Sequence, residues 1–337
     1  MISAVQFRNF KALRSAAVKL GPFNLVIGPN GSGKTSLIEA LLRLRSLAGL
    51  PAARRPGGPP PDTTGPELVF HFNPPYQDVR VALACDSAEF ACNLLMVDHP
   101  PGLDGERLWA DLRARLLTIR AFLFDHSAMA LPAERTEHAQ LAANAGNLAA
   151  VLAARREKSP AAFARLEEEF RRIMPEFSAL DFRPAAPGRL ELTVRTAGSG
   201  GEALAADRLS QGTLYLLAIL TLAHDPEPPA IVCLEEADRG VHPRMLREVR
   251  DALYRLSYPR DCGEADRDPV QVVATTHSPY LLDLLKEHPE EVVLANKQGN
   301  AASFERLSDR KDLVELMRET NLGDLWYSGI LGGVPGE

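Results

Sequence analysis

Long apolar runs are missing from this 337-residue chain. The longest of them, from Leu214 to Ala223, is far shorter than the roughly 18 residues that a membrane-spanning helix needs. The opening segment, MISAVQFRNFKAL, has no apolar stretch of the kind that secretory signal peptides carry. We therefore expect a soluble, cytoplasmic protein without a membrane partner.

Cysteine is scarce as well. The chain has four cysteines, and no two of them form a CxxC pair. Without an export signal, isolated thiols are kept reduced in the cytoplasm. We expect all four to be free, namely Cys85, Cys92, Cys233 and Cys262.

An excess of positive charge is also absent. Lysine and arginine number 38 against 44 aspartates and glutamates, which gives a net charge of -6. A protein that binds nucleic acid over its whole surface is usually basic, so DNA is a possible partner that the net charge does not support. The densest basic group is Arg43, Arg45, Arg54 and Arg55, which is either a solvated face or a local DNA contact.

Two stretches are poor in residues that build regular elements. Residues 48–67 hold six prolines and four glycines, which predicts a loop. Residues 196–206 have the composition of a flexible linker. No internal repeat is present, and no heptad run is long enough for a coiled coil.

Outside these stretches, short apolar runs alternate with helical patterns. The predicted strands are Phe23–Ile27, Leu68–Phe72, Val79–Cys85, Phe90–Val97, Ala230–Leu234, Val270–Thr275 and Glu291–Ala295. Helices are expected over Thr35–Leu47, from Pro160 with Ser159 as its N-cap, and over Leu214–Leu222. Strands that alternate with helices imply an α/β fold with a mostly parallel sheet covered on its faces.

The segment from Gly28 to Thr35, GPNGSGKT, matches the phosphate-loop pattern GxxxxGK[ST] in full. Its glycines let backbone N–H groups curve around a phosphate, and the helix that follows directs its positive end toward the same anion. Lys34 can reach the β- and γ-phosphates, and the Thr35 hydroxyl can ligate Mg²⁺. A predicted strand precedes the motif and a helix follows it, as the motif requires.

Two carboxylates, Glu235 and Glu236, end the apolar run that begins at Ala230. A carboxylate at such a strand end can hold Mg²⁺ through water, and its neighbour can orient an attacking water molecule. Alone, the pair could equally open a solvated loop. Together with a complete phosphate loop, it favours a role in the chemistry.

Two further polar positions lie at the ends of elements. Ser210 and Gly212 open the helix over Leu214–Leu222 and form a second potential anion site, or a plain N-cap. One nucleotide that is already wrapped by the phosphate loop does not need a second helix N-terminus, which indicates a contact with a partner subunit. His277 follows the strand Val270–Thr275, where ligands bind in open α/β sheets.

These four motifs, in this order, resemble the ABC ATPase superfamily. Within it the chain looks like the SMC, RecF and OLD-like group, closest to the stand-alone bacterial ATPases related to OLD proteins. The resemblance covers almost the whole chain, and the segments that carry it are Val5–Lys11, Gly146–Leu152, Leu209–Thr213, Glu235–Pro243, Thr275–Pro279 and Leu322–Gly333.

The resemblance implies a fold and an organisation. The fold is α/β, an ABC-type P-loop NTPase head with a mixed or parallel sheet core, a helical insertion lobe and no long coiled coil. Residues 1–337 would form one ATPase domain. Its parts would be a phosphate-loop lobe over 1–100, an insertion over 101–206, a signature, Walker B and switch lobe over 207–300, and a tail over 301–337.

The resemblance also assigns the site, with ATP and Mg²⁺ as its ligands. Glu236, His277 and Lys34 would be catalytic, and Thr35 and Glu235 would hold the metal. The nucleotide would be bound by Gly28, Asn30, Gly31, Ser32, Gly33, Lys34, Thr35 and Ser36, with Arg8 and Asn9 nearby. Ser210 and Gly212 would touch the γ-phosphate of the partner subunit in a homodimer.

The chain departs from the family at three points. Ala237 stands where the family usually has Pro, and Glu235 replaces the Asp of transporters. No glutamine is assigned to a Q-loop, because Gln77 lies in the right third of the chain but its surroundings do not match the family closely. No acidic DxD cluster follows His277, so we expect no intrinsic nuclease of the OLD type.

Two functions agree with these motifs. The first is an Mg²⁺-dependent ATPase whose dimerisation follows its nucleotide state, in a DNA-related or phage-defence system. The second is an ATP-gated binding module with slow hydrolysis, which captures an effector protein such as a nuclease or toxin. A transporter ATPase would need a clear Q-loop for docking membrane subunits, and the sequence has none.

Overall fold

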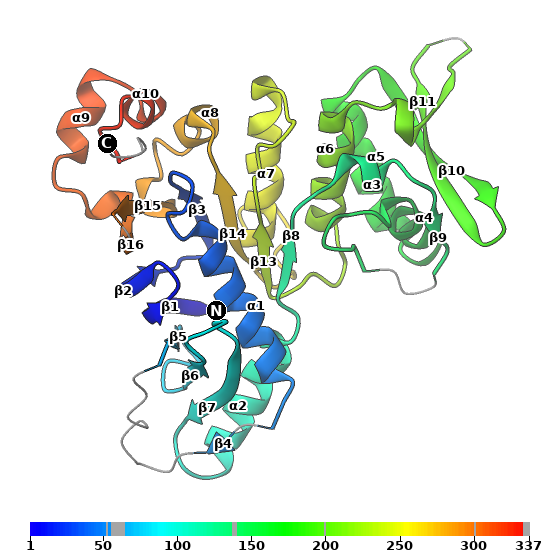
Figure 1. Cartoon of the computed structure of the whole chain (residues 1–337). Coiled ribbons are helices and arrows are strands. Elements are labelled where there is room, and N and C mark those ends of the chain that lie inside the picture. The colour runs from blue at the N-terminus through cyan, green and yellow to red at the C-terminus, as the bar shows by residue number, and fades with distance from the viewer. Residues whose placement is uncertain (52, 55–64, 137–139, 199, 300, 333–337) are drawn as a thin grey trace. The chain divides into compact units, whose positions relative to one another are not determined.

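The computed structural model describes residues 1–51, 53–54, 65–136, 140–198, 200–299 and 301–332 (Figure 1). The chain divides into two compact units, each built from segments that are distant in sequence. The first unit contains residues 1–121, 229–234 and 266–337, and the second contains residues 122–228 and 235–265. This division cuts across the four sequential parts expected from the resemblance.

A mostly antiparallel sheet forms one layer of the first unit. Its strand order is β2-β1-β5-β6-β7-β4, with only the β4–β7 pair parallel. The bounds are β1 Ile2–Phe10, β2 Leu13–Lys19, β4 Ala53–Arg54, β5 Glu67–Phe72, β6 Arg80–Cys85 and β7 Cys92–Asp98. Strands β5, β6 and β7 match the predicted strands to within two residues, whereas β4 lies inside the stretch predicted to be a loop.

A second sheet carries the parallel strands that the sequence predicts. Its order is β16-β15-β3-β14-β13-β8, in which β15, β3, β14 and β13 are parallel and β16 is antiparallel. The bounds are β3 Phe23–Ile27, β8 Arg120–Phe122, β13 Ile231–Leu234, β14 Gln271–Thr276, β15 Val292–Gln298 and β16 Ala301–Arg306. Because these strands are parallel, the ends of β3, β14 and β13 lie at one edge of the sheet.

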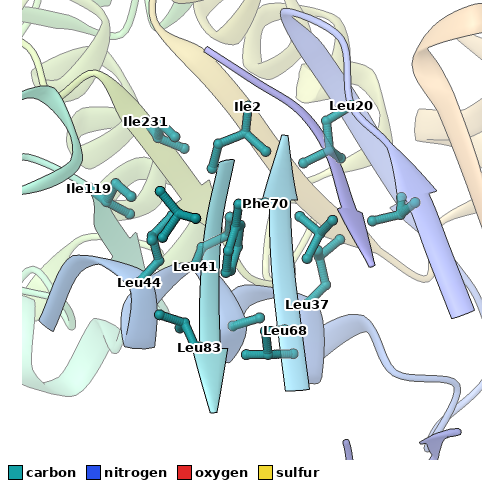
Figure 2. Close-up of a cluster of buried hydrophobic side chains, with 14 of the residues drawn as sticks. Ile2, Leu20, Leu37, Leu41, Leu44, Leu68, Phe70, Leu83, Ile119 and Ile231 are labelled. Atoms are coloured by element: carbon teal, nitrogen blue, oxygen red, sulfur yellow. The ribbon is translucent and has the colours of Figure 1, made fainter. Parts of the chain in front are cut away.

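Helix α1, Lys34–Ala48, packs in the main hydrophobic core of the first unit. Figure 2 shows Leu37, Leu41 and Leu44 of this helix among apolar side chains of the antiparallel sheet, including Leu68 and Phe70. The same cluster includes apolar residues from the parallel sheet, so the helix is buried against both layers. This packing anchors the helix that begins at the phosphate loop.

The remaining helices of the first unit are α2, Leu103–Leu116, and a group at the C-terminal end. That group contains α8 Pro279–Asp283, the short 3₁₀ turns Pro289–Glu291 and Leu307–Asp309, α9 Leu313–Glu319 and α10 Leu322–Tyr327. Among the described residues, no helix is long and apolar enough to cross a membrane.

The second unit combines helices with a small antiparallel sheet. The helices are α3 His126–Met129, α4 Leu148–Lys158, α5 Pro160–Ile173, α6 Gln211–Ala223 and α7 Leu246–Ser257, with 3₁₀ turns at Ala206–Arg208 and Pro243–Met245. The sheet contains β9 Ala133–Glu134, β10 Phe177–Ala186, β11 Arg189–Thr196 and β12 Ala203–Ala205. Strand β12 lies within residues 196–206, so the prediction of a linker there was wrong for that part.

The prediction of four free cysteines was also wrong. Cys85 and Cys92 are joined by a disulfide, while Cys233 is buried and free and Cys262 is exposed and free. Cys85 and Cys92 face each other across the antiparallel pair β6–β7. A spacing of seven residues therefore becomes a direct contact through strand pairing, whereas a CxxC pattern concerns only cysteines that are three residues apart.

Candidate functional site

The phosphate-loop motif lies where its pattern requires, between a buried strand and a helix. Strand β3 ends at Ile27, the loop follows, and α1 begins at Lys34. Gly31 and Gly33 have φ values of 74° and 96°, in the left-handed region that a residue with a Cβ rarely adopts. The loop therefore has the strand–loop–helix geometry in which backbone N–H groups bind a phosphate.

Lys34 is buried, and its Nζ donates hydrogen bonds inside the loop. The acceptors are the carbonyl oxygens of Gly28, at 2.6 Å, and Pro29, at 2.9 Å. The ammonium group is thus held at the mouth of the loop, where a phosphate oxygen can replace a carbonyl as its partner. Thr35, one residue further along α1, is exposed.

Ser32 places a buried polar group in the loop. Its side chain is 1% exposed, and its Oγ has no hydrogen-bond partner among the described residues. A buried hydroxyl without a partner is costly unless a ligand or water completes it. The loop therefore fits a bound triphosphate, which would be held by Lys34, by the loop's N–H groups and, through Mg²⁺, by Thr35.

Gly28 is required by packing. A Cβ built on this residue would lie 2.2 Å from the carbonyl oxygen of Ala295, on the neighbouring strand β15, and 2.6 Å from Ser32 Oγ. Real Cβ atoms essentially never approach that closely. The sequence motif indicates why a glycine helps to curve the loop, but the close approach of β15 is visible only in the structure.

His277 lies at the same sheet edge as the loop. Strand β14 pairs in parallel with β3 so that Thr276 lies opposite Ile27, and His277 directly follows Thr276. The His277 side chain is exposed. Ser278 then caps α8, because its Oγ accepts a hydrogen bond from Leu281 N.

The C-terminal helix α10 supports α8, the helix that follows His277. Gly323 N donates to Asp283 Oδ1 at 2.6 Å, and a Cβ on Gly323 would lie 2.9 Å from the carbonyl oxygen of Pro279. Burial raises the pKa of Asp283 above its ordinary value. The sequence indicates the C-terminal segment Leu322–Gly333 only by its resemblance to the C-terminal segments of related proteins. The structure shows that α10, within this segment, contacts α8, the helix that follows His277.

The two glutamates occupy a turn. Strand β13 ends at Leu234, and residues 235–240 form consecutive turns in the second unit. Glu235 N donates to Phe122 O at 2.8 Å, which holds its backbone, and its side chain is partly buried. Glu236 has a left-handed φ of 51°, its side chain is half exposed, and an ion pair of 3.5 Å joins it to Arg239.

The alternation of side chains along an extended strand does not continue through both glutamates. Successive residues point to opposite sides only in an extended chain. Glu236 is in the left-handed region, so the strand alternation stops before it. Both glutamates lie in the turn that follows β13, and their division between metal and water remains a prediction.

The signature segment, Leu209–Thr213, lies at the start of α6 in the second unit. Ser210 caps the helix, because its Oγ accepts from Thr213 N at 3.1 Å. Gly212 is buried against the turn after Glu236, and a Cβ built on it would lie 3.0 Å from Gly240 O. The Gln211 side chain covers Gly240 in turn, with atoms 2.3–2.6 Å from the Cβ position of that glycine.

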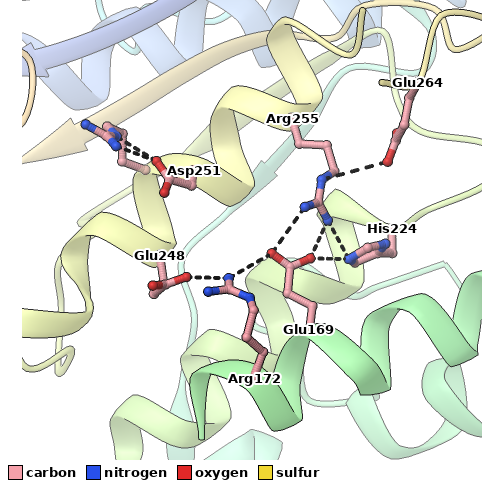
Figure 3. A network of polar contacts seen from close by, with 8 residues as sticks. Glu169, Arg172, His224, Glu248, Asp251, Arg255 and Glu264 are labelled. Atoms are coloured by element: carbon pink, nitrogen blue, oxygen red, sulfur yellow. Dashed lines mark hydrogen bonds and ion pairs between the residues drawn. The ribbon is translucent and has the colours of Figure 1, made fainter. Parts of the chain in front are cut away.

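A buried polar network joins the far end of α6 to α5 and α7 (Figure 3). His224, at the C-terminal end of α6, lies 2.6 Å from Glu169 Oε2, and Arg255 of α7 donates to the same carboxylate. Burial alone would raise the pKa of Glu169, but the hydrogen bonds from His224 and Arg255 outweigh it and lower that pKa to about 2. The charged carboxylate is thus strongly stabilised in the folded protein. No sequence pattern indicated this network.

Arg8 and Asn9 lie near the C-terminal end of β1 in the antiparallel sheet. Arg8 is half exposed and pairs with Glu67 at 3.2 Å, in a shallow cleft of the outer sheet face. Asn9 has a left-handed φ of 51°. Near them, Leu13 Cδ2 lies 3.1 Å from the Cβ position of Gly33, which brings the start of β2 to the phosphate loop. The predicted nucleotide contacts of Arg8 and Asn9 stay predictions.

The structure ties part of the basic group into the fold. Arg43 lies over the Phe10 ring, with its Cζ 5.7 Å from the ring centroid, and Arg45 donates to Ile119 O at 3.1 Å. Arg54 lies in β4, and Arg55 lies outside the described residues. The two arginines of α1 are therefore engaged by neighbouring side chains and backbone, which favours a structural role for them over a DNA contact. Gln77 is exposed, and its side-chain amide donates a hydrogen bond to the adjacent Asp78.

A cavity of about 470 Å³ lies elsewhere in the first unit. Its lining includes Phe72, Tyr76, Leu112 and Ile231. Ile231 begins β13, whereas the phosphate loop follows the end of β3, which runs in the same direction. The cavity is therefore at the opposite edge of the sheet from the loop and is not the nucleotide site.

Two family models match this chain, and together they cover the four motifs. A family model described as "AAA domain, putative AbiEii toxin, Type IV TA system" matches residues 104–283. A second, described as "AAA ATPase domain", matches residues 1–50. The first match contains the signature segment, the two glutamates and His277, and the second contains the phosphate loop.

Individual relatives have low sequence identity and extensive coverage. The OLD nuclease of Thermus scotoductus is 23% identical over 389 residues, covering 96% of this chain and 68% of that protein. Among solved structures, an SMC head bound to the C-terminal winged-helix domain of ScpA has a TM-score of 0.57 at 16% identity, covering 93% of this chain and 99% of that one. An SMC head from Pyrococcus furiosus bound to the C-terminal domain of ScpA gives 0.57 at 13% identity, with 94% and 99% coverage.

The SMC head domain of Thermotoga maritima has a TM-score of 0.50 at 15% identity, covering 90% of this chain and 98% of that one. At such identities the structural similarity concerns the fold alone. It confirms a mixed α/β head of the expected class, and the described residues contain no long coiled coil.

Proposed function

We propose that this chain binds ATP with Mg²⁺, hydrolyses it and dimerises according to its nucleotide state. The chain belongs to the AAA domain family whose model matches residues 104–283. It is an SMC- and OLD-like P-loop ATPase of the ABC type. The family assignment gives the class of protein. The reaction, the metal and the dimer are the proposal, as is a role in a DNA-related or phage-defence system.

The phosphate loop is the observation that carries the proposal. It is complete in sequence, it lies between β3 and α1, and Lys34 Nζ is held at the carbonyls of Gly28 and Pro29. Lys34 has lost access to water, because the side chain is buried, and a buried ammonium is most stable beside an anion. A triphosphate supplies that anion and also a partner for the buried Ser32 hydroxyl.

The residues of this chain can then divide the work of hydrolysis. Lys34 and the N-terminus of α1 neutralise charge on the β- and γ-phosphates. Thr35 and Glu235 would hold Mg²⁺, which would supply further positive charge at the phosphates when bound. Glu236 would take a proton from the attacking water, and His277 would contact the γ-phosphate from the end of β14.

Ser210 supports the dimer. It caps α6 at an exposed helix N-terminus, while the phosphate loop already provides the N-terminus of α1 to the nucleotide of its own subunit. A second helix N-terminus can serve the nucleotide of another subunit. We expect an ATP-stabilised homodimer with an interface of roughly 1,200–2,000 Å² or more.

The two glutamates provide the test of the reaction. Glu236→Gln keeps the size of the side chain but cannot accept a proton, so it should leave ATP binding intact and lower turnover by roughly 10²–10⁴. Glu235→Gln should weaken Mg²⁺-dependent binding, because it removes charge next to the ion. Glu227→Gln, at an exposed position before β13, is the matched control and should behave as wild type.

Calorimetry with ATP and Mg²⁺ gives the affinities, and phosphate release gives the turnover. Normal hydrolysis by Glu236→Gln together with an inactive, normally binding Glu235→Gln would mean that the two roles are reversed. Light scattering of Glu236→Gln with ATP and Mg²⁺ should report a dimer. A strict monomer under those conditions would contradict the nucleotide-gated assembly.

A second candidate function is an ATP-gated module with slow hydrolysis that captures an effector protein. It is favoured by the two SMC heads of the same fold that were solved in complexes with domains of ScpA. The two candidates differ in turnover. Fast hydrolysis by the isolated protein supports the enzyme, whereas hydrolysis that appears only with a partner protein or DNA supports the binding module.

A further inference from the structure

The strand register brings a second lysine to the phosphate loop. Strand β15 runs parallel to β3, with Leu294 opposite Ile27, the last residue of β3. Beyond Ile27 the chain enters the loop, while β15 continues as strand to Gln298. The residues after Leu294 therefore run beside the loop, and Lys297 is one of them.

The contact is close. A Cβ built on Gly31 would lie 3.3 Å from Lys297 Nζ, with the Cδ and Cε atoms of the same side chain at 3.8 and 3.9 Å. Gly31 has no side chain and a left-handed φ, so its backbone is open to this approach. The ammonium group of Lys297 thus lies against the middle of the loop, and a side chain on Gly31 would crowd it.

Among the residues that the structure describes, Lys297 has no carboxylate partner that would explain its place. Its side chain is exposed, and no ion pair or hydrogen bond of its ammonium group occurs within the part of the chain that the structure describes. The loop already contains backbone N–H groups and Lys34, which together create a positive potential. The Lys297 ammonium group adds to this potential. Ser32 Oγ, one residue after Gly31, is buried and has no hydrogen-bond partner among the described residues. This is independent evidence that the loop binds a polar ligand.

We infer that Lys297 is a second phosphate-binding lysine, which contacts the phosphate chain of the nucleotide from β15 in addition to Lys34 on α1. The inference rests on the proposed binding of ATP and adds a residue to it. Lys34 lies inside the loop and is buried, whereas Lys297 approaches from the neighbouring strand and remains in contact with water. Its contribution is therefore electrostatic and sensitive to salt.

The test compares ATP affinity in Lys297→Ala, Lys297→Arg and Lys19→Ala by calorimetry at low and high salt. A charged hydrogen bond to phosphate implies about tenfold weaker binding for Lys297→Ala at low salt, with most of the affinity restored in Lys297→Arg. Lys19 is a matched exposed lysine. It lies six residues along β2 from Leu13, the residue beside Gly33, and is therefore about 20 Å away. Lys19→Ala should bind as wild type.

Salt separates a charge contact from a structural effect. The gap between wild type and Lys297→Ala should shrink severalfold as salt rises, because exposed charges are screened. Unchanged ATP affinity in Lys297→Ala, or a loss that Lys297→Arg does not restore and salt does not alter, overturns the inference while leaving ATP binding intact. Failure of the wild-type protein to bind ATP would instead overturn the proposed function and this inference together.

Discussion

Replacing Glu169 by glutamine should destabilise the second unit markedly. The carboxylate is 10% exposed and is contacted by His224, by Arg255 through both terminal nitrogens, and by Arg172 at 3.7 Å (Figure 3). Glu169→Gln keeps the shape of the side chain but removes its charge. Arg255 then has only Glu264, at 3.8 Å, as a charged partner in the network.

Two terms decide the size of the effect. Each hydrogen bond to a charged group is worth about 1.5–3 kcal/mol, and Glu169 accepts such bonds from Arg255 and His224. A neutral amide is easier to bury than a carboxylate, which offsets part of the loss. Removing one partner of a buried pair typically costs about 3 kcal/mol or more, so we expect about 3 kcal/mol at pH 7.

The pH dependence has a definite sign. The pKa of Glu169 falls from 4.5 to about 2 on folding. The ionised carboxylate therefore contributes stability that is present above pH 4.5 and is lost as the pH falls toward 2. Wild-type stability should decline through that window, and Glu169→Gln should lack this part of the decline.

Denaturant unfolding followed by circular dichroism measures both effects, and the midpoint should fall without a change in slope. Glu248→Gln on α7 is the control. Glu248 pairs at 2.6 Å with Arg172, a half-exposed residue, and a pair of that kind is worth at most about 1 kcal/mol. Equal destabilisation by the two variants, or a Glu169→Gln midpoint within error of wild type, would refute the account of the network.

Two further predictions concern the phosphate loop. Lys34→Ala removes the buried cation at the mouth of the loop, so ATP binding itself should be lost, and calorimetry that shows unchanged affinity would remove the phosphate-loop assignment. Gly28→Ala places a Cβ 2.2 Å from Ala295 O, so thermal unfolding should show destabilisation by about 1–3 kcal/mol together with weaker ATP binding, and a fully stable variant would contradict the observed packing of β15 on the loop.

The sequence predicts elements well where the local pattern is decisive. Strands β3, β13, β14 and β15 are short apolar runs that end at polar residues, and the structure places all four in one parallel sheet. Helix α1 follows the phosphate loop and has an apolar face that fits the core. In these segments, burial and local preference agree, so pattern alone is sufficient.

Prediction fails where structure depends on a distant partner. Strand β12 has only three residues and forms through its pairing with β11, so composition alone suggests a linker. Cys85 and Cys92 meet through the register of β6 and β7. Ser159 precedes α5 as predicted, but its side chain makes no capping hydrogen bond, because its own backbone is not in the extended conformation that caps usually adopt.

The candidate site divides in the same way. Lys34, Thr35 and His277 could be placed from sequence, because the ends of parallel strands share one edge and each residue follows such an end. Lys297 could not, since its contact with Gly31 depends on β15 extending beyond β3 in parallel register. A polar residue two positions past the last buried residue of a strand gives no signal until the neighbouring strand is known.

The backbone at Glu236 departs from the extended conformation of the strand that ends at Leu234. A left-handed φ costs roughly 1–2 kcal/mol for a residue other than glycine. The turn that maintains it is held by Arg239 N, which donates to Glu236 O at 2.8 Å, and by the burial of Ala237. Gly240 and Gly212 then pack against each other, which joins this turn to the start of α6. Glu236 is the proposed base for one nucleotide, and the N-terminus of α6 at Ser210 is proposed to contact the nucleotide of the partner subunit. Both therefore belong to one packed structure within the second unit, and a movement of either must disturb the other.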